Sequence, residues 1–340
     1  MGADTQEFQR TKRRKIVKIR VNQKSVSKQF LALQILLLML LSPLSGCFGT
    51  DMPEQAEMIE EINALENPCA QGSQSVTQST TSVMVNGQER LFRLSVPSSD
   101  AGDKLALIVA FHGGGGAEED FQQQNEFDQL AEQEKFIMAY AIAEEDRTAS
   151  EGEWFLNTDA TSREDNDFSE AIVDELSTAY CIDQDRLYAI GYSLGSMFTY
   201  EIACQLNHRF AAVASFAGTM PVDPQTCELE GNMAVMHIHG KLDYIIDYDD
   251  DWDWKDGEHE GVGTMSSVPG MIDSWAARAN CASSEVVEDF TLEHITHSGC
   301  LGDTRVELYG LEFQEHTWPD EVDGTDTYQL IWDFLSDFTN

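Results

Sequence analysis

Basic residues are scarce in this sequence. Its 340 residues include 21 Lys and Arg against 60 Asp and Glu, which gives a formal net charge of −39 at pH 7. A surface of this charge repels polyanions, so nucleic acid is excluded as a partner. Because the hydrophobic fraction is an ordinary 42%, we expect the acidic residues to coat a packed core rather than to indicate disorder.

Long hydrophobic runs are also missing. The most apolar stretch, FLALQILLLMLL from Phe30 to Leu41, is too short to span a membrane comfortably. Basic residues precede it, and it ends in Leu44-Ser45-Gly46-Cys47, which resembles the lipobox of prokaryotic lipoproteins, where cleavage before the cysteine leads to its lipidation. We therefore expect residues 1–46 to be a lipoprotein signal peptide, Cys47 to be lipidated, and residues 47–75 to form a polar, acidic tether.

An uncleaved signal anchor with an incidental cysteine is the alternative interpretation of the same segment. Both interpretations place the folded part outside the cytoplasm, at the extracellular face of the cell membrane or secreted. Under the first of them, the membrane is a partner through the lipidated Cys47.

No CxxC spacing occurs, and the 8 histidines do not cluster with the cysteines, so a zinc site is not expected. We predict no metal and no other cofactor. Besides Cys47, an even number of cysteines suits disulfide bonding in an oxidising compartment. These are Cys69, Cys181, Cys204, Cys227, Cys281 and Cys300. Counting alone leaves their connectivity open.

Short apolar strands alternate with amphipathic segments beyond Gly102, after two β-rich stretches that meet at a hairpin signal, Asn86-Gly87. This order predicts an α/β fold with a mostly parallel central sheet, helices on both faces and an antiparallel edge. We expect one domain over residues 76–340, and a monomer. The expected strands are 104–111, 137–143, 186–192, 211–218, 234–240 and 304–311, and the last two expected helices are 267–280 and 327–338.

A serine between two glycines stands where one of these strands gives way to a helix. The sequence Gly191-Tyr192-Ser193-Leu194-Gly195 matches the nucleophile elbow of α/β-hydrolases, in which a strained strand-to-helix turn presents the serine hydroxyl to substrate. Taken alone the pattern is weak evidence. The strand before it and the helix after it supply the required context, so Ser193 is the candidate nucleophile.

A serine hydroxyl needs a histidine base and a carboxylate that orients this base. In the α/β-hydrolase order, the acid follows a strand beyond the nucleophile and the histidine comes later still. Asp243 directly follows the strand AVMHIHG, and His316 lies in EHTWP before the last helix. Asp243 and His316 are therefore the candidate acid and base.

Backbone donors for an oxyanion are expected after the strand 104–111, where His112 is followed by four glycines. Glycines let the backbone approach a substrate closely, as in HGGG-type oxyanion motifs. We predict an oxyanion hole made by the amides of Gly114 and Leu194, with Gly115 as the alternative to Gly114. His112 is expected to brace this loop by hydrogen bonding.

Five stretches together resemble the extracellular polyhydroxybutyrate depolymerase and feruloyl esterase family of the carbohydrate esterase family 1 group: AFHGGGG, YCIDQDRLYAIGYSLGSM, FAAVASFAG, HIHGKLD and EHTWP. The likeness runs from about Thr80 to Asn340. It implies the α/β-hydrolase fold, with Ser193 as nucleophile, Asp243 as acid and His316 as base.

The resemblance also implies disulfides, since some cysteines stand where family members have them. It implies the pairs Cys204–Cys227 and Cys281–Cys300. Cys69 and Cys181 are then left to pair with each other.

The segment from Asp243 to Gly261 departs from the family pattern, because it is strongly acidic. Within it, the loop 247–260 is either an acidic surface loop or an insert in which Trp252 and Trp254 stack on a sugar or phenolic ring. Calcium binding is a third interpretation, although the loop lacks the EF-hand glycine and terminal glutamate. Its ligands would be Asp249, Asp251 and Asp253.

Further cleft candidates are His112, Tyr192 and Trp318, while Trp154 either lines the cleft or packs. His237 and His239 are expected on opposite faces of a buried strand, each as a hydrogen-bonded structural residue rather than a metal ligand.

These patterns predict a lipid-anchored serine esterase that acts through an acyl-enzyme. Esters of hydroxyalkanoate oligomers or polymers are the first expected substrates, and feruloyl or acetyl esters on polysaccharides are the second. A non-catalytic module that holds polysaccharide at the cell surface is the alternative of a different class.

Overall fold

The computed structural model describes residues 67–115, 121–143, 154–158, 161–255 and 261–340. The expected signal peptide, Cys47 and the tether up to residue 66 lie outside the described residues. In the part that is described, no helix combines the length and apolar character needed to cross a membrane.

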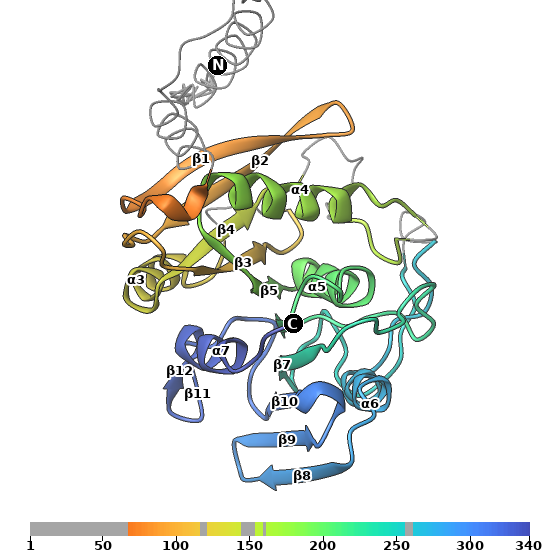
Figure 1. Ribbon diagram of the computed structural model, residues 1–340. Helices are drawn as coiled ribbons and strands as arrows, with labels where there is room; N and C mark the ends of the chain where they lie inside the picture. The colour runs from red at the N-terminus through yellow and green to blue at the C-terminus, as the bar shows by residue number, and fades with distance from the viewer. Residues whose placement is uncertain (1–66, 116–120, 144–153, 159–160, 256–260) are drawn as a thin grey trace, which may run out of the picture. The chain divides into compact units, whose positions relative to one another are not determined.

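One ten-stranded sheet organises the described residues, in the order β1-β2-β4-β3-β5-β6-β7-β10-β9-β8 (Figure 1). Its six middle strands run parallel. In sheet order these are β4 (Phe136–Ala141), β3 (Leu105–Phe111), β5 (Ile182–Tyr192), β6 (Ala212–Phe216), β7 (Ala234–Gly240) and β10 (Val306–Leu311). Every residue of β3, β4, β6 and β7 is buried. This explains why these strands are near-continuous apolar runs, as strands covered on both faces are.

Helices cover both faces of the sheet. The first face packs against α4 (Glu164–Ala179), α5 (Leu194–Gln205) and α6 (Val268–Arg278). The second packs against α3 (Gln124–Glu134) and α7 (Thr327–Ser336). Side chains of β3 alternate between the two cores, with Leu107 and Val109 in the first and Ile108 in the second. The predicted fold class, an α/β-hydrolase sheet with helices on both faces, is confirmed.

The amino-terminal edge of the sheet is the expected hairpin, β1 (Val76–Val85) and β2 (Gln88–Val96), which pair antiparallel. Asn86 and Gly87 both have positive φ, 51° and 87°, as a two-residue hairpin turn with the right-handed twist of its strands requires. Residues before β1 are held to this edge, since Ser73 accepts from Ser99 N–H and its hydroxyl donates to the carbonyl of Pro97.

A second antiparallel hairpin, β8 (Ser283–Glu288) and β9 (Leu292–Ser298), forms the opposite edge beside β10 (Figure 1). Our sequence analysis assigned no element to this segment. All six residues of β8 are exposed, so the strand lacks the alternation of apolar and polar residues that marks a half-buried strand. Pairing with β9, rather than burial, defines β8.

Small elements complete the chain. They are η1 (Pro68–Ala70), η4 (Leu301–Asp303) and the two-residue strands β11 (Glu321–Val322) and β12 (Thr325–Asp326).

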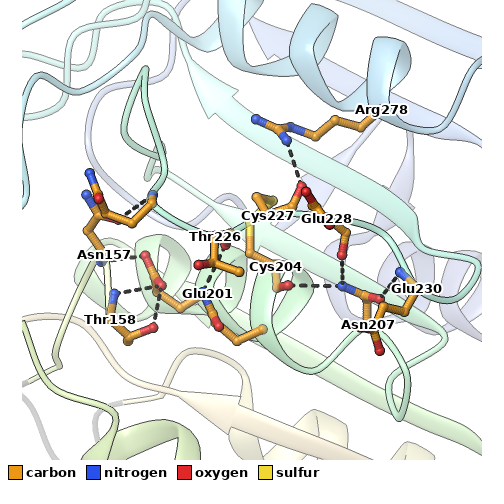
Figure 2. Close-up of a disulfide and its surroundings, with 12 residues drawn as sticks. Asn157, Thr158, Glu201, Cys204, Asn207, Thr226, Cys227, Glu228, Glu230 and Arg278 are labelled. Carbon is orange, nitrogen blue, oxygen red and sulfur yellow. Dashed lines mark hydrogen bonds between the residues drawn. A yellow bond between two sulfur atoms is a disulfide. The ribbon is translucent and has the colours of Figure 1, made fainter. Parts of the chain in front are cut away.

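Three disulfides form the pairs Cys69–Cys181, Cys204–Cys227 and Cys281–Cys300, so the predicted pairing is confirmed. Figure 2 shows the second, which ties α5 to the segment before β7. Cys69–Cys181 fastens the residues before β1 to the start of β5. Disulfides are typical of proteins outside the reducing cytoplasm, which agrees with a secreted protein.

The disulfides should differ in their effect on stability, because they close loops of different length. Cys69 and Cys181 are 112 residues apart, whereas Cys281 and Cys300 are 19 apart. From the entropy of the unfolded chain, we expect the double substitution Cys69→Ala/Cys181→Ala to lower the free energy of unfolding by about 5 kcal/mol and Cys281→Ala/Cys300→Ala by about 3 kcal/mol. Urea titration of the two matched variants measures this, and equal losses would contradict the loop-length argument.

Candidate active site

Ser193 lies at the turn between β5 and α5, in an uncommon backbone conformation with φ 53° and ψ −121°. The turn is tight because two glycines flank it. A Cβ on Gly195 would lie 2.1 Å from the carbonyl oxygen of Phe111, and one on Gly191 would lie 2.2 Å from that of Gly195. Only glycine fits either position, since a real Cβ does not approach an oxygen so closely. The motif thus brings α5 directly against the end of β3, with Ser193 half-buried at the tip of the turn, as in a nucleophile elbow.

The structure brings Ser193, His316 and Asp243 together from three segments. His316 Nε2 lies 2.9 Å from Ser193 Oγ, and its Nδ1 lies 2.6 Å from Asp243 Oδ2. Asp243 follows β7, and its Oδ1 accepts hydrogen bonds of 2.9 Å from the N–H groups of Ile245 and Ile246. These contacts hold the carboxylate in one orientation. The order nucleophile, base and orienting carboxylate is the arrangement that activates a serine hydroxyl.

The Asp243 side chain is fully buried. Burial by itself raises the pKa of this carboxyl, but hydrogen bonds from His239, His316 and the Ile246 N–H outweigh it and lower the pKa well below its usual range. Asp243 is therefore ionised at neutral pH. An ionised carboxylate can only accept, so the hydrogen on His316 lies on Nδ1 and its Nε2 is free to accept the proton of Ser193 Oγ.

Tyr192 holds the backbone of the His316 turn. Its hydroxyl donates to the carbonyl oxygen of His316 at 3.0 Å, and its ring stacks on Phe216 at 5.7 Å. Burial, with a contribution from nearby Asp243, raises the pKa of Tyr192 to about 12, so the hydroxyl keeps its proton and remains a donor. Trp318 in the same turn donates from Nε1 to Gln123 Oε1 at 3.0 Å. Two residues expected to line a cleft thus also fix the loop that carries the base.

His112 is buried at the start of the glycine loop, where both ring nitrogens are used. Nε2 accepts from the N–H of Ala143 at 3.1 Å, so in the neutral ring Nδ1 donates to the carbonyl oxygen of Gly113 at 2.8 Å. In a trans peptide the carbonyl oxygen and the next N–H point in opposite directions. By fixing the Gly113 carbonyl, His112 therefore fixes the direction of the Gly114 N–H.

The other predicted donor, the Leu194 N–H, belongs to the first residue of α5. N–H groups of the first helical turn have no partner within the helix. The N–H of Ser193 itself is bonded to the Phe216 carbonyl at 2.9 Å. A Cβ on Gly113 would lie 3.3 Å from Ser193 Cβ, so the glycine loop and the elbow are neighbours.

Trp252 and Trp254 form a T-shaped pair with ring centroids 4.9 Å apart. Both are half-buried and pack against the core beneath α4, α5 and α6. The backbone of Trp252 pairs with Met265. The predicted stacking of these rings on a sugar or phenolic ring stays a prediction. It requires that the exposed part of each ring is large enough to contact such a ligand.

The acidic side chains around this pair are engaged within the loop. Asp251 accepts from the N–H of Ser267, and Asp253 accepts from the hydroxyl of Thr264. Asp249 donates its N–H to Asp247. Within the described ranges, no three carboxylate, histidine or cysteine side chains converge as metal ligands do. Residues 256–260 of this loop lie outside the described residues.

The placement of His237 and His239 corrects the sequence analysis, which expected them on opposite faces of β7. Their rings share a face, with His237 Nε2 2.9 Å from His239 Nδ1. The reason is the period of a strand: alternate residues point the same way, so positions two apart are neighbours on one face.

Sequence analysis missed a buried carboxylate on the nucleophile helix. Glu201 accepts from the N–H groups of Asn157 and Thr158 at 2.6 and 3.3 Å (Figure 2). The same segment carries Trp154, whose Nε1 donates to the His112 carbonyl at 2.8 Å and whose ring stacks on Phe198. The signal available in the sequence was the one charged residue of this helix.

Comparison with known proteins finds similarity to esterases. The family model described as phospholipase/carboxylesterase matches residues 95–252. The NocK esterase candidate of Nocardia uniformis subsp. tsuyamanensis is 30% identical over 63% of this chain and 59% of its own length. The bifunctional acetylxylan esterase/xylanase XynS20E of Neocallimastix patriciarum is 24% identical over 68% of this chain and 31% of its own. Feruloyl esterase B of Piromyces equi is 22% identical over 72% and 44%.

The chain thus spans less than two thirds of each of these relatives. The feruloyl esterase part of the expected resemblance is confirmed, and the polyhydroxybutyrate depolymerase part stays a prediction. Among solved structures, an acetyl xylan esterase from Aspergillus awamori shares the fold with a TM-score of 0.55 and 15% identity, covering 76% of this chain and 99% of that one. A thermostable esterase does so with a TM-score of 0.51 and 17% identity, covering 77% and 63%.

The tyrosine that supports the His316 turn offers a test of this geometry. Tyr192→Phe keeps the ring but removes the hydrogen bond to the His316 carbonyl, which costs about 1 kcal/mol in a typical case. We expect kcat for a p-nitrophenyl ester to fall about fivefold with an unchanged melting temperature. Tyr328→Phe in α7, whose hydroxyl bonds only to exposed Asp326 among the described contacts, is the matched control. Identical kcat values for the two variants would show that the turn does not need this support.

The arrangement of Ser193, His316 and Asp243 lies at the carboxyl end of a parallel sheet shared with solved esterases. A carboxylesterase family model matches residues 95–252, and relatives named as esterases are similar over 63% to 72% of the chain. The chain therefore shares the α/β-hydrolase fold with solved esterases and resembles carboxylesterases in sequence.

Proposed function

We propose that this protein is a serine carboxylesterase that works through an acyl-enzyme on Ser193. The observation that carries the proposal is the position of His316, with one ring nitrogen on the serine hydroxyl and the other on a buried carboxylate. His316 Nε2 takes the proton of Ser193 Oγ as the oxygen attacks the ester carbon. The developing oxyanion is met by the N–H groups of Gly114 and Leu194.

Collapse of the tetrahedral intermediate breaks the ester bond, and His316 gives its proton to the departing alkoxide. The acyl group is left on Ser193 Oγ. Water then enters, gives a proton to His316 Nε2 and attacks the acyl carbon. The second collapse returns the proton to Ser193 and releases the carboxylic acid. Every proton in this cycle passes through one imidazole, whose other face is fixed by Asp243.

The surface beside the triad favours an uncharged, apolar substrate. Leu242, Tyr244 and Ile245 flank Asp243 in sequence and are 53%, 79% and 54% exposed. Tyr244 is close enough to Tyr192 to contribute to its raised pKa. An apolar rim of this kind suits an aromatic or alkyl acyl group better than a small acetyl group.

Feruloyl esters on polysaccharides are therefore the substrates we propose first, because relatives named as feruloyl esterases and the apolar rim support them together. Acetyl esters on polysaccharides are supported by a relative named as an acetylxylan esterase. Esters of hydroxyalkanoates are the alternative to both kinds of polysaccharide ester, since the same apolar rim suits their alkyl chains.

Hydrolysis of an ester panel by the mature chain tests the function. The panel holds p-nitrophenyl acetate and butyrate, methyl ferulate, acetylated xylan and 3-hydroxybutyrate oligomers, each at low and high salt. We expect Ser193→Ala to lower kcat by at least about 10⁴-fold, because the nucleophile is lost. Ser177→Ala, in α4, is the matched control and should retain full activity.

The preferred ester decides between the substrate classes. If folded wild-type protein turns over none of these esters but is retained on polysaccharide, the esterase proposal is wrong and a binding module takes its place.

We also propose that the protein is anchored at the extracellular face of the membrane through a lipidated Cys47, and that it is a monomer. The lipobox-like sequence and the disulfides support export and anchoring. We expect Cys47→Ala to move the protein from the membrane fraction to the soluble fraction. Mass spectrometry of membrane-extracted protein should find residue 47 as the modified amino terminus, and an intact residue 1 would contradict this. Light scattering of the mature chain measures its oligomeric state.

A further inference from the structure

A line of buried polar side chains leads from the helix that follows Ser193 to the triad carboxylate. Tyr200 of α5 places its hydroxyl 2.8 Å from His237 Nδ1, and His237 Nε2 lies 2.9 Å from His239 Nδ1. His239 Nε2 lies 3.3 Å from Asp243 Oδ2 and 3.1 Å from the carbonyl oxygen of Ile246. Both histidines are 0% exposed and Tyr200 is 1% exposed. Apolar residues would fill this space without the free-energy cost of burying polar groups. The buried polar side chains therefore indicate a function beyond packing.

The acceptor end of the line sets the position of every proton in it. Asp243 and the Ile246 carbonyl can only accept, so His239 carries its hydrogen on Nε2. A neutral His239 then accepts at Nδ1, which places the hydrogen of His237 on Nε2. Burial, helped by nearby His239, lowers the pKa of His237 well below its usual value, so this ring is neutral and accepts at Nδ1. The hydroxyl of Tyr200, whose pKa burial raises, donates to it.

All donors in this line therefore point toward the triad carboxylate. Asp243 Oδ2 lies beside two imidazole nitrogens, 2.6 Å from His316 Nδ1 and 3.3 Å from His239 Nε2, whose hydrogen is shared with the Ile246 carbonyl at 3.1 Å. The titratable groups that face His239 are His237, Asp243 and Tyr248, with Tyr200 and His316 one residue further along. Tyr248 lies edge-on to the His239 ring at 5.8 Å and donates its hydroxyl to Glu293, away from the line. Lys241 lies over the Tyr248 ring at 5.6 Å.

We propose that His239 is a positioning residue of the active site, which keeps the Asp243 carboxylate oriented toward His316. It is the last donor in a chain of hydrogen bonds that begins at the Tyr200 hydroxyl and in which every donor points toward Asp243. Its role is electrostatic as well as geometric. A second N–H on Oδ2 draws part of the carboxylate charge away from His316. The negative charge left on the His316 side of the carboxylate still orients His316. It stabilises the protonated imidazolium less than a carboxylate without the His239 contact would. The inference rests on the proposed esterase function, because the carboxylate matters only if His316 is the base.

Loss of the His239 donor should therefore change the pH dependence of catalysis, which a packing role would not. With one donor fewer, the negative charge of Asp243 concentrates on the side of His316 and favours the protonated imidazolium. Activity needs the neutral imidazole. The acid limb of the kcat/KM profile should then move to higher pH.

His239→Leu and His239→Gln form the matched pair that tests this. Both fill the site, but only glutamine can donate toward Asp243. For p-nitrophenyl butyrate, we expect His239→Leu to lower kcat about 10- to 100-fold with little change in KM, as loss of a supporting hydrogen bond does at other sites. The acid limb should shift upward in the same variant. His239→Gln should recover most of kcat and return the limb toward the wild-type position.

A spectroscopic measurement makes the test independent of turnover. In ¹⁵N NMR of the full-length protein at neutral pH, His237 and His239 should both appear with the ring hydrogen on Nε2. Circular dichroism and thermal melts confirm that each variant is folded.

Each outcome decides the inference. A folded His239→Leu variant with a wild-type pH profile overturns it, as does a glutamine variant no better than leucine, or a charged or Nδ1–H His239 in the spectra. If the wild-type protein hydrolyses no ester, the proposed function fails. The spectra then show separately whether the donor line exists.

Discussion

The close approach of α5 to the end of β3 is the constraint on which the site depends. Because Gly195 has no side chain, the helix backbone contacts the Phe111 and His112 carbonyls directly. This contact brings the start of α5 beside the glycine loop that follows β3. A serine at the helix start therefore lies next to backbone donors from a different part of the chain. The candidate nucleophile and the proposed oxyanion donors are thus brought together by one packing contact, beside which Ser193 has its uncommon φ of 53°.

Surrounding this contact, buried polar groups are paired so that each fixes a neighbour. His112 orients the Gly113 carbonyl, Trp154 holds the His112 carbonyl, and Glu201 holds the segment that carries Trp154. The scarce basic residues are used in the same way. Arg90 pairs with Asp165 and Arg93 with Asp128, all of them buried. Removal of one partner of a buried ion pair strongly lowers the stability of the protein, because it leaves the other charge buried and unpaired. These pairs also remove positive charge from the surface.

Much of this arrangement could be predicted from sequence, because apolar strands and the residues that follow them occur in a recognisable order along the chain. Ser193, Asp243 and His316 each follow an apolar strand, and parallel strands bring their carboxyl ends to one edge of the sheet. The hairpin at Asn86-Gly87 was likewise local. The β8–β9 hairpin was not predictable in the same way, because β8 is exposed throughout and is defined by pairing with β9, which in turn pairs with β10. The role of Glu201 depends on a loop more than forty residues away in sequence, on which no local pattern reports.

His239 shows most clearly which contacts can be predicted from the sequence and which cannot. That it shares a face with His237 follows from the period of a strand and was predictable, whereas its contact with Asp243 depends on how the chain turns at the end of β7. The pairing of the Trp252 backbone with Met265 is a further case, since the acidic sequence left open whether this segment is a surface loop or an insert with stacking rings. In both cases the deciding contact joins segments that the sequence does not mark as neighbours.

If the proposed esterase function holds, the acidic coat has a kinetic consequence. An ester enters as a neutral molecule, but the acid formed from it is an anion at neutral pH. A chain with a formal net charge of −39 attracts the first no less than any other neutral molecule and repels the second. Since repulsion between exposed charges weakens with ionic strength, the surface discriminates between what arrives and what departs most strongly in dilute salt. Hydrolysis would thus turn a molecule that the net charge of the protein does not repel into one that it does.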